Sequence, residues 1–293
     1  QAFGGAVGLV LARAIVRDIY GAEEAARVIA TLVMVMVVIP MLSPAVGGEL
    51  MNQFGWQSIF IAIALLCILI LMLTINYLPE TLKEPVPFEG VRAMLLIFFR
   101  LFKSPAYCGY AFCVTFVSVV FFSFISAAPE IMVSVLDRPP TEYGYYFIMV
   151  PLGFMLGNYV TRYFGHRLEL NQLITWGGFI SVLGITLAFI LLSSGIKHPL
   201  ALFAPIAVSV FGNGITLPNA MAAAINEFPN FAGSASGLTG FLQMGFSAVA
   251  AQVVALIFNG TVYPLLLMMF AAAILSLVSL KLGVSAERHG GAV

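Results

Sequence analysis

The strongest constraint on this chain is a series of long apolar runs that contain almost no charged residue. A helix needs about 20 apolar residues to cross roughly 30 Å of hydrocarbon, and a charge at its centre costs about 2.5 to 3.5 kcal/mol. Runs of this length therefore predict membrane-spanning helices. A partial run occupies residues 1–12, and the eight full runs are residues 28–48, 56–78, 104–129, 143–161, 170–196, 199–226, 231–258 and 261–280.

The composition agrees with a chain that is solvated mostly by lipid. Of the 293 residues, 61% are hydrophobic and only 9% are charged, which is more apolar than a soluble domain tolerates. The net charge of zero provides no basic surface for nucleic acid. Neither an H-E-x-x-H sequence nor a phosphate-binding glycine loop occurs, and the three cysteines lack the spacing of metal ligands. We therefore expect no metal site and no enzyme activity.

The basic residues predict the orientation. Alternate connections on one side hold Arg13, Arg17, Arg27, Lys83, Arg92, Arg100, Lys103, Arg162, Arg167, Lys281 and Arg288. The opposite connections hold only Arg138 and Lys197. Because cytoplasmic loops retain an excess of Lys and Arg, we predict that the first side and the C-terminus are cytoplasmic.

The connection at residues 79–103 is the natural domain boundary, because it is long and carries three prolines and four basic residues. Three runs precede it and six follow it. A transporter built from two equal six-helix bundles would have six on each side. We therefore expect residues 1–78 to be the second half of an N-terminal bundle, helices 4–6. Residues 79–103 would be a cytoplasmic linker, and residues 104–293 a C-terminal six-helix bundle, helices 7–12, with a short tail.

Several segments resemble one transporter family over essentially the whole chain. They are the glycine-rich start at residues 1–8, then residues 11–18, 40–48, 54–60, 78–82 and 232–243. These segments are similar to those of the Bcr/CflA (bicyclomycin and chloramphenicol resistance) drug:proton antiporters of the major facilitator superfamily. The resemblance implies an all-α polytopic fold of nine spans, equivalent to helices 4–12. It also implies a multi-pass protein of the bacterial inner membrane.

The resemblance implies a secondary active transporter that exports drugs or other amphiphilic small molecules in exchange for protons by alternating access. Such a protein would work as a monomer in the bilayer, with the proton gradient as its energy source and no cofactor. In this family the main proton-titrating acid and an essential arginine belong to helices one and four, in positions that would precede Gln1. We therefore expect that residues 1–293 alone do not transport.

Two other functions stay open at this point. A proton-coupled exporter of a metabolite, such as a sugar, nucleoside or amino acid, would share the same fold. A non-transporting polytopic membrane protein would need a catalytic cluster at membrane depth or an appended soluble domain, and the sequence shows neither of them.

Two motifs are expected to control the conformational change. Proline removes a backbone donor and glycine permits close helix approach, so the segment that resembles the antiporter signature predicts a kinked gate. Its residues are Pro40, Pro44, Gly47 and Gly48, with Ser43 where the family has glycine before proline. The segment that resembles the cytoplasmic loop signature of the superfamily contains Gly157, Arg162, Gly165 and Arg167.

Polar and aromatic residues at membrane depth are candidates for a substrate cavity. An unpaired amide is costly in hydrocarbon, so some amides must face a cavity or a neighbouring helix. The candidate residues are Asn158, Asn213, Asn219, Gln243, Phe116 and Tyr146, and Phe112, Phe121, Phe122 and Phe124 also lie on the same aromatic run as Phe116. Glu130 follows Pro129 at the outer end of an uncharged run, and burial there would let it carry a proton.

Overall fold

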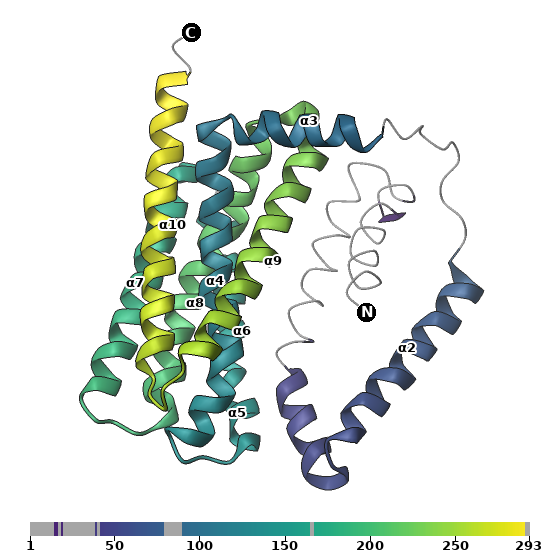
Figure 1. Cartoon of the computed structure of the whole chain (residues 1–293), viewed down its shortest axis with the longest axis vertical. Helices are drawn as coiled ribbons and strands as arrows, with labels where there is room; N and C mark the ends of the chain where they lie inside the picture. Colours follow the sequence, from purple (N-terminus) through teal and green to yellow (C-terminus); the bar gives the residue numbers. More distant parts are fainter. Residues whose placement is uncertain are drawn as a thin grey trace. The chain divides into compact units, whose positions relative to one another are not determined.

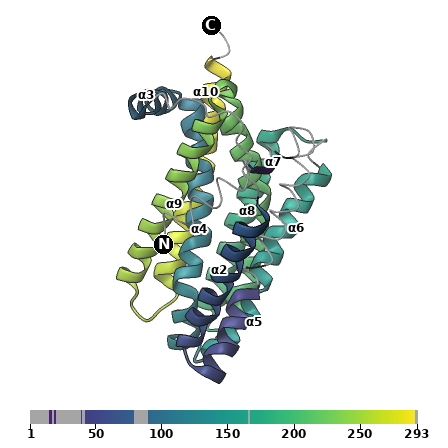
Figure 2. The ribbon, with the colours of Figure 1, turned by 90° about the vertical axis from the view of Figure 1, so that its right-hand side faces the viewer.

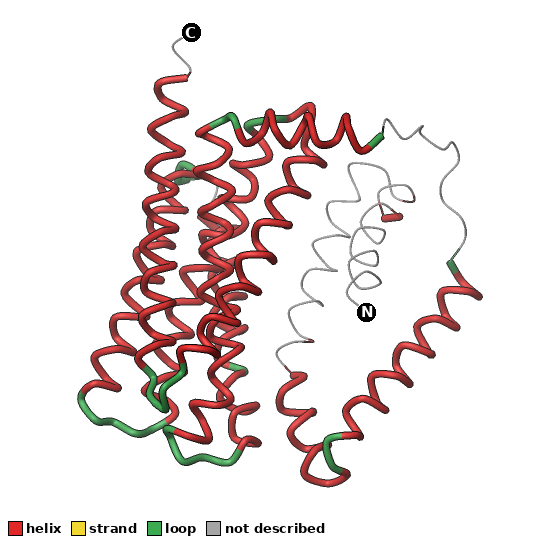
Figure 3. Tube along the Cα trace, viewed as in Figure 1, coloured by secondary structure: helices red, strands yellow, loops and turns green. Residues whose placement is uncertain are grey.

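The computed structural model describes residues 42–78, 90–164 and 167–290, together with Ile15, Val16, Ile19 and Ile39. The described residues form helices and short connections, with no strand among them, which confirms the predicted all-α class (Figure 3). The chain divides into two compact units, residues 1–88 and residues 89–293. The predicted run at residues 1–12 and most of the run at residues 28–48 lie outside the described residues.

The first unit shows two described helices, one at residues 42–54 and α2 at Gln57–Tyr77. Gly55 separates them with a φ of +81°, a left-handed conformation that glycine adopts without steric cost. The Ser58 hydroxyl donates to the backbone oxygen of Gly55 at 2.6 Å and so ties the first turn of α2 to this bend. The 21 residues of α2 are long and apolar enough to cross a membrane, as predicted for residues 56–78.

The second unit is a helical bundle with a shorter helix, α3, at one end (Figure 1). The bounds of its α-helices are α3 Val91–Phe102, α4 Pro105–Ser134, α5 Pro140–Phe147, α6 Met149–Phe164, α7 Leu170–Ser193, α8 Pro199–Asn226, α9 Ala232–Ile257 and α10 Tyr263–Gly290, with one 3-10 turn at Pro229–Phe231. Helices α6 and α7 both pack on α8, whereas α9 and α10 both pack on α4. The contact between α4 and α8 joins these two groups.

Helix starts in this unit follow local sequence signals. Pro105 and Pro199 occupy the first helical position of α4 and α8, where the missing N–H of proline has no intrahelical partner to lose. Helix α7 begins with a reciprocal capping box between Glu169 and Gln172. By length and composition α4, α7, α8, α9 and α10 can each cross a membrane, so the unit is a multi-pass membrane domain.

The structure corrects the expected elements in three places. The run predicted as one span at residues 143–161 is broken at Ile148 into α5 and α6, because Pro151 cannot donate to the carbonyl of Phe147 and its ring crowds that carbonyl. Helix α4 continues past Pro129 to Ser134. The predicted linker contains α3, which lies across the end of the bundle (Figure 2).

Helix α3 is held to the bundle by one face. Leu101 is fully buried in the core cluster that contains Tyr107 and Tyr110 of α4, and Ile97 and Phe98 pack on the same cluster. The Arg100 guanidinium lies over the Phe231 ring at 5.8 Å from its centroid, which adds a cation–π contact. This end of the bundle also holds the C-terminal end of α10 (Figure 1).

Glycines allow the closest helix contacts of the bundle. A Cβ atom at Gly109 of α4 would overlap with the backbone of Gly283 on α10, and one at Gly212 of α8 would overlap with the carbonyl of Gly177 on α7. In lipid, van der Waals packing rather than hydrophobic burial associates helices, so backbone approach at small residues is a main source of stability. The two contacts fix α7 on α8 and α10 on α4.

Candidate functional site

The predicted amides lie mostly within the packed bundle. The Asn219 amide donates to the backbone oxygen of Ile215 at 2.7 Å and to the Thr161 hydroxyl at 3.3 Å, so it links α8 to α6. The Asn158 amide donates to the carbonyl of Phe154 in its own helix. Asn213 is buried, with 3% of its surface exposed, and its amide nitrogen has no hydrogen-bond partner. The Asn158 and Asn219 amides are therefore hydrogen-bonded within the bundle, whereas the buried Asn213 amide nitrogen is unpaired there.

Three aromatic rings gather where α4 meets α9. Phe112 and Phe116 are stacked with centroids 6.2 Å apart, and the Phe246 ring meets both of them edge-on, at 6.0 Å and 6.2 Å. All three rings remain partly or largely exposed. Gln243 lies one turn before Phe246 on α9 and is half-buried. We call Phe112, Phe116, Gln243 and Phe246 the α4–α9 face.

Helical spacing extends this face toward the outer end of α4. Phe116, Ser126 and Glu130 stand 4, 14 and 18 positions after Phe112. At about 100° per residue all three lie within about 40° of Phe112 around the helix, so they form one stripe. The side chains of Ser126 and Glu130 are exposed, so the burial expected for Glu130 from the sequence is not found. The Ser126 hydroxyl lies 3.5 Å from the carbonyl of Ala251 on α9. The stripe thus presents aromatic rings, a hydroxyl and, at its outer end, a carboxylate.

Other aromatic residues of the same run are packing residues. Phe124 is fully buried and meets Phe203 of α8 edge-on at 5.5 Å. Phe121 packs against the core cluster that contains Phe124 and Phe203. The sequence alone does not show that Phe124 is buried and that Phe116 is partly exposed, because a membrane helix is apolar on every side.

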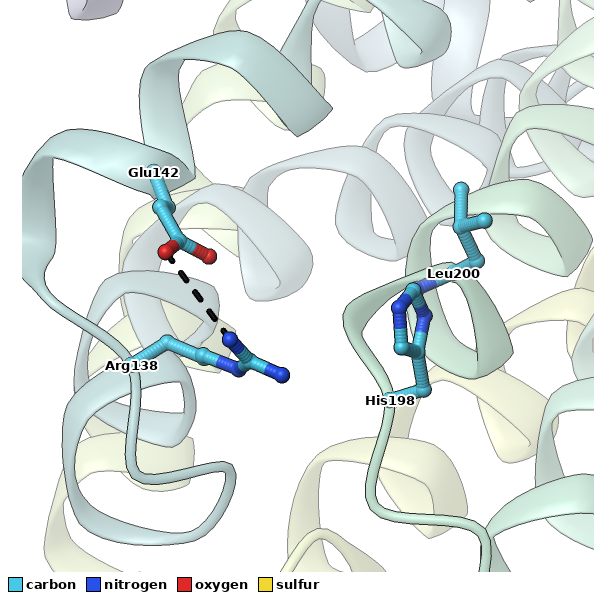
Figure 4. Close-up of polar contacts among 4 residues, drawn as sticks. All are labelled: Arg138, Glu142, His198 and Leu200. Atoms are coloured by element: carbon cyan, nitrogen blue, oxygen red, sulfur yellow. Dashed lines mark hydrogen bonds and ion pairs between the residues drawn. The ribbon is translucent and has the colours of Figure 1, made fainter.

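Tyr146 lies apart from the α4–α9 face. Its ring contacts Phe203 at 5.7 Å and His198 at 6.4 Å, at the opposite end of the bundle from α3. His198 accepts a hydrogen bond from the backbone N–H of Leu200 through Nδ1 and so caps α8. Figure 4 draws His198 in the same view as the ion pair between Arg138 and Glu142, whose atoms are 3.9 Å apart. This is the end that carries few basic residues.

The two expected gating motifs are only partly described. In the antiporter segment, Pro44, Gly47 and Gly48 lie within the helix at residues 42–54 of the first unit, and Pro40 lies outside the described residues. In the loop segment, Gly157 lies inside α6 and packs on α8, so it is a packing residue of the helix rather than of the loop. 

The basic residues of the loop segment lie at the end of α6. Arg162 is in the last turn of α6 and is exposed. The Arg167 guanidinium lies over the Tyr163 ring, 5.9 Å from its centroid. Gly165 is outside the described residues. No group of His, Cys, Asp or Glu within the described ranges is arranged to hold a metal ion.

Sequence reasoning missed Phe246. This residue stands in α9, three positions after Gln243, and only its contact with two phenylalanines of α4 separates it from the other exposed apolar residues of that helix. A pairing between helices more than 100 residues apart leaves no local pattern.

Known proteins are similar in sequence to most of this chain. Residues 1–252 match the family model of the Major Facilitator Superfamily. The chain is 29% identical over 289 residues to the bicyclomycin resistance protein homolog of Haemophilus influenzae, covering 95% of this chain and 70% of that protein. It is 26% identical over 260 residues to multidrug resistance protein D of Escherichia coli K12, covering 88% of this chain and 64% of that protein.

The fold also has a counterpart among solved structures. The crystal structure of a bacterial homolog to the human lysosomal transporter Spinster, in an inward-facing and unoccupied conformation, matches with a TM-score of 0.63. The match covers 94% of this chain and 74% of that chain at 14% sequence identity, which is evidence for the fold alone.

Proposed function

The chain belongs to the Major Facilitator Superfamily and is a membrane transporter rather than an enzyme, and we propose that it exports drug-like amphiphilic molecules in exchange for protons. The support for drugs as substrates comes from relatives that are named for bicyclomycin and multidrug resistance. The support from the chain itself is the α4–α9 face.

The α4–α9 face is the observation that carries this proposal. Aromatic rings bind flat apolar or cationic molecules through their faces and edges, without the fixed hydrogen bonds that a sugar or amino acid needs. Phe112, Phe116 and Phe246 offer such surfaces, and Gln243 adds one amide beside them. A site with many ring surfaces and few polar groups tolerates different substrates, which fits multidrug export better than export of one metabolite.

Proton coupling requires a group that changes charge within reach of the transport path. Glu130 is a carboxylate on the same stripe of α4 as Phe116, about 21 Å along the helix axis at a rise of about 1.5 Å per residue. We place the protein in a bacterial inner membrane with its C-terminus in the cytoplasm. Glu130 then lies toward the outer end of α4, where a proton can enter from outside. The orientation follows from Arg100, Lys103 and Lys281 at one end of the bundle and Lys197 at the other.

The test is growth of an efflux-deficient bacterium that expresses the natural gene, on a panel of antibiotics and dyes that includes bicyclomycin and chloramphenicol. We expect resistance to several unrelated compounds, and dye efflux that a protonophore abolishes. Efflux that persists after the proton gradient is collapsed would reject proton coupling. No protection despite membrane expression would reject drug export and would favour a metabolite exporter of the same fold.

A further inference from the structure

A groove of about 760 Å³ lies between α7 and α10, away from the α4–α9 face. Helix α7 contributes Gln172, Trp176 and Phe179 to its wall, and α10 contributes Val278 and Lys281. The two helices pack against each other along this line. The groove lies wholly within the second unit and toward the end that holds the C-terminal part of α10.

The lining of the groove changes from polar to apolar along its length. At the start of α7 it is lined by Glu169 and Gln172, and α10 contributes Lys281. One to two turns deeper along α7 it is lined by Trp176 and Phe179, with the Thr175 hydroxyl among them, and α10 contributes Val278. A phospholipid has the same gradient, with a charged headgroup at the membrane surface and acyl chains below it. Trp176 lies at the transition, where indole rings favour the interface.

The outward side of α7 continues the apolar end of the groove. Trp176, Phe179, Leu183, Leu187 and Ile190 form one helical stripe, and their side chains are between 42% and 63% exposed. This stripe is made of carbon-rich side chains only, as expected for a surface that contacts acyl chains. Lys281 lies 18 residues after the start of α10, about 27 Å along its axis at a rise of about 1.5 Å per residue, which places it at the opposite membrane surface from Tyr263.

The charged end of the groove has one group of each sign. Glu169 presents a carboxylate and Lys281 an ammonium, and within the described part of the chain no ion pair joins them. The Glu169 carboxylate is held in place because it accepts the backbone N–H of Gln172 in the capping box, and a carboxylate has further lone pairs to offer. A purely anionic headgroup would meet Lys281 favourably but Glu169 unfavourably.

We propose that this groove binds a phospholipid whose headgroup carries both a phosphate and a primary ammonium, as phosphatidylethanolamine does. Lys281 takes the phosphate, and Glu169 accepts hydrogen bonds from the ammonium. A choline headgroup has no N–H to donate to that carboxylate, so it binds less tightly. The acyl chains lie along Phe179 and Val278. The proposal does not depend on which molecule the transporter exports.

The two tryptophans of the chain allow a direct test. The variant Trp56→Phe leaves Trp176, inside the groove, as the sole tryptophan. The purified protein is placed in phosphatidylcholine bilayers that contain an equal mole fraction of lipid brominated on its acyl chains, with an ethanolamine, choline or glycerol headgroup. Bromine quenches tryptophan fluorescence on contact. We expect the ethanolamine lipid to bind at Trp176 about threefold more tightly than the choline lipid, within the range that exposed ion pairs contribute.

Variants of the two charged residues proposed to contact the headgroup complete the test. Glu169→Asn in the Trp56→Phe background is expected to bring the ratio between ethanolamine and choline lipids close to one, and Asn retains a helix-capping oxygen. Lys281→Gln in the same background is expected to weaken binding of both lipids and to leave their ratio unchanged, because both headgroups carry the phosphate. Lys197→Gln, at the other end of the bundle, is the matched control and should leave the ratio unchanged. Equal quenching by all three lipids in the Trp56→Phe protein, or strongest quenching by the glycerol lipid, would overturn the proposal. The first result would indicate bulk lipid only, and the second an anionic-lipid site.

Discussion

Gly157 of α6 packs directly on the backbone carbonyl oxygen of Phe211 in α8, and a Cβ atom at position 157 would overlap with that oxygen. We predict that Gly157→Ala destabilises the protein by about 1 to 3 kcal/mol, the usual cost of overpacking, since two backbones must move apart. Thermal unfolding in detergent measures the effect. Gly237→Ala on α9 is the control, because no neighbouring atom lies within 4 Å of a Cβ at that position. Equal melting temperatures for the two variants would show that the α6–α8 contact is not tight.

The aromatic rings of the α4–α9 face provide the second prediction. Phe246→Ala removes edge contacts with both Phe112 and Phe116 and should raise drug sensitivity, because an aromatic contact is worth about 0.5 to 1.5 kcal/mol, or about 2- to 13-fold in affinity. Phe241→Ala on the same helix, whose side chain is 73% exposed, should leave resistance unchanged. Inhibitory drug concentrations at matched expression measure both variants. If both variants lose drug resistance to the same extent, the cause is a general folding defect and not the loss of a substrate contact.

The third prediction concerns Glu130. Glu130→Gln keeps the size and hydrogen-bonding atoms of the side chain but removes its negative charge, so we expect dye efflux to lose its dependence on the pH gradient. Dye binding, measured by fluorescence polarisation, should remain. Glu142→Gln is the control, since Glu142 only forms an exposed pair with Arg138, and such a pair contributes about 0 to 1 kcal/mol. Unaltered gradient dependence in Glu130→Gln would assign the proton to another residue.

The fourth prediction tests a buried hydrogen bond between α4 and α9. The Tyr107 hydroxyl donates to the carbonyl of Ala235 at 2.9 Å and lies 3.0 Å from the Thr239 hydroxyl. A double-mutant cycle of Tyr107→Phe and Thr239→Val should give a coupling energy of about 0.6 kcal/mol, which is typical of hydrogen bonds between membrane helices. Thr186 bonds only to the carbonyl of Val182 in its own helix, so Tyr107→Phe combined with Thr186→Val should show no coupling. Unfolding in denaturant provides both values.

The apolar runs of the sequence are enough to predict the class of the protein and the course of most helices. A bilayer has no water to satisfy backbone groups, so an apolar run of sufficient length must be helical. This constraint correctly located α2, α7, α8 and α9, and it located α10 except for its last ten residues, because α10 continues past residue 280 to Gly290. Local signals also defined helix starts, such as Pro105, Pro199 and the pair Glu169 and Gln172.

The remaining features depend on contacts between distant segments, which no local pattern in the sequence predicts. The docking of α3 through Leu101 required the neighbouring helices to be in place. The meeting of Phe116 with Phe246 and the groove between Glu169 and Lys281 join residues more than 100 positions apart. In a soluble protein, a polar outer face would reveal which side of each helix is buried. In lipid both sides are apolar, so close backbone approach at residues such as Gly157, rather than hydropathy, selects the packed face.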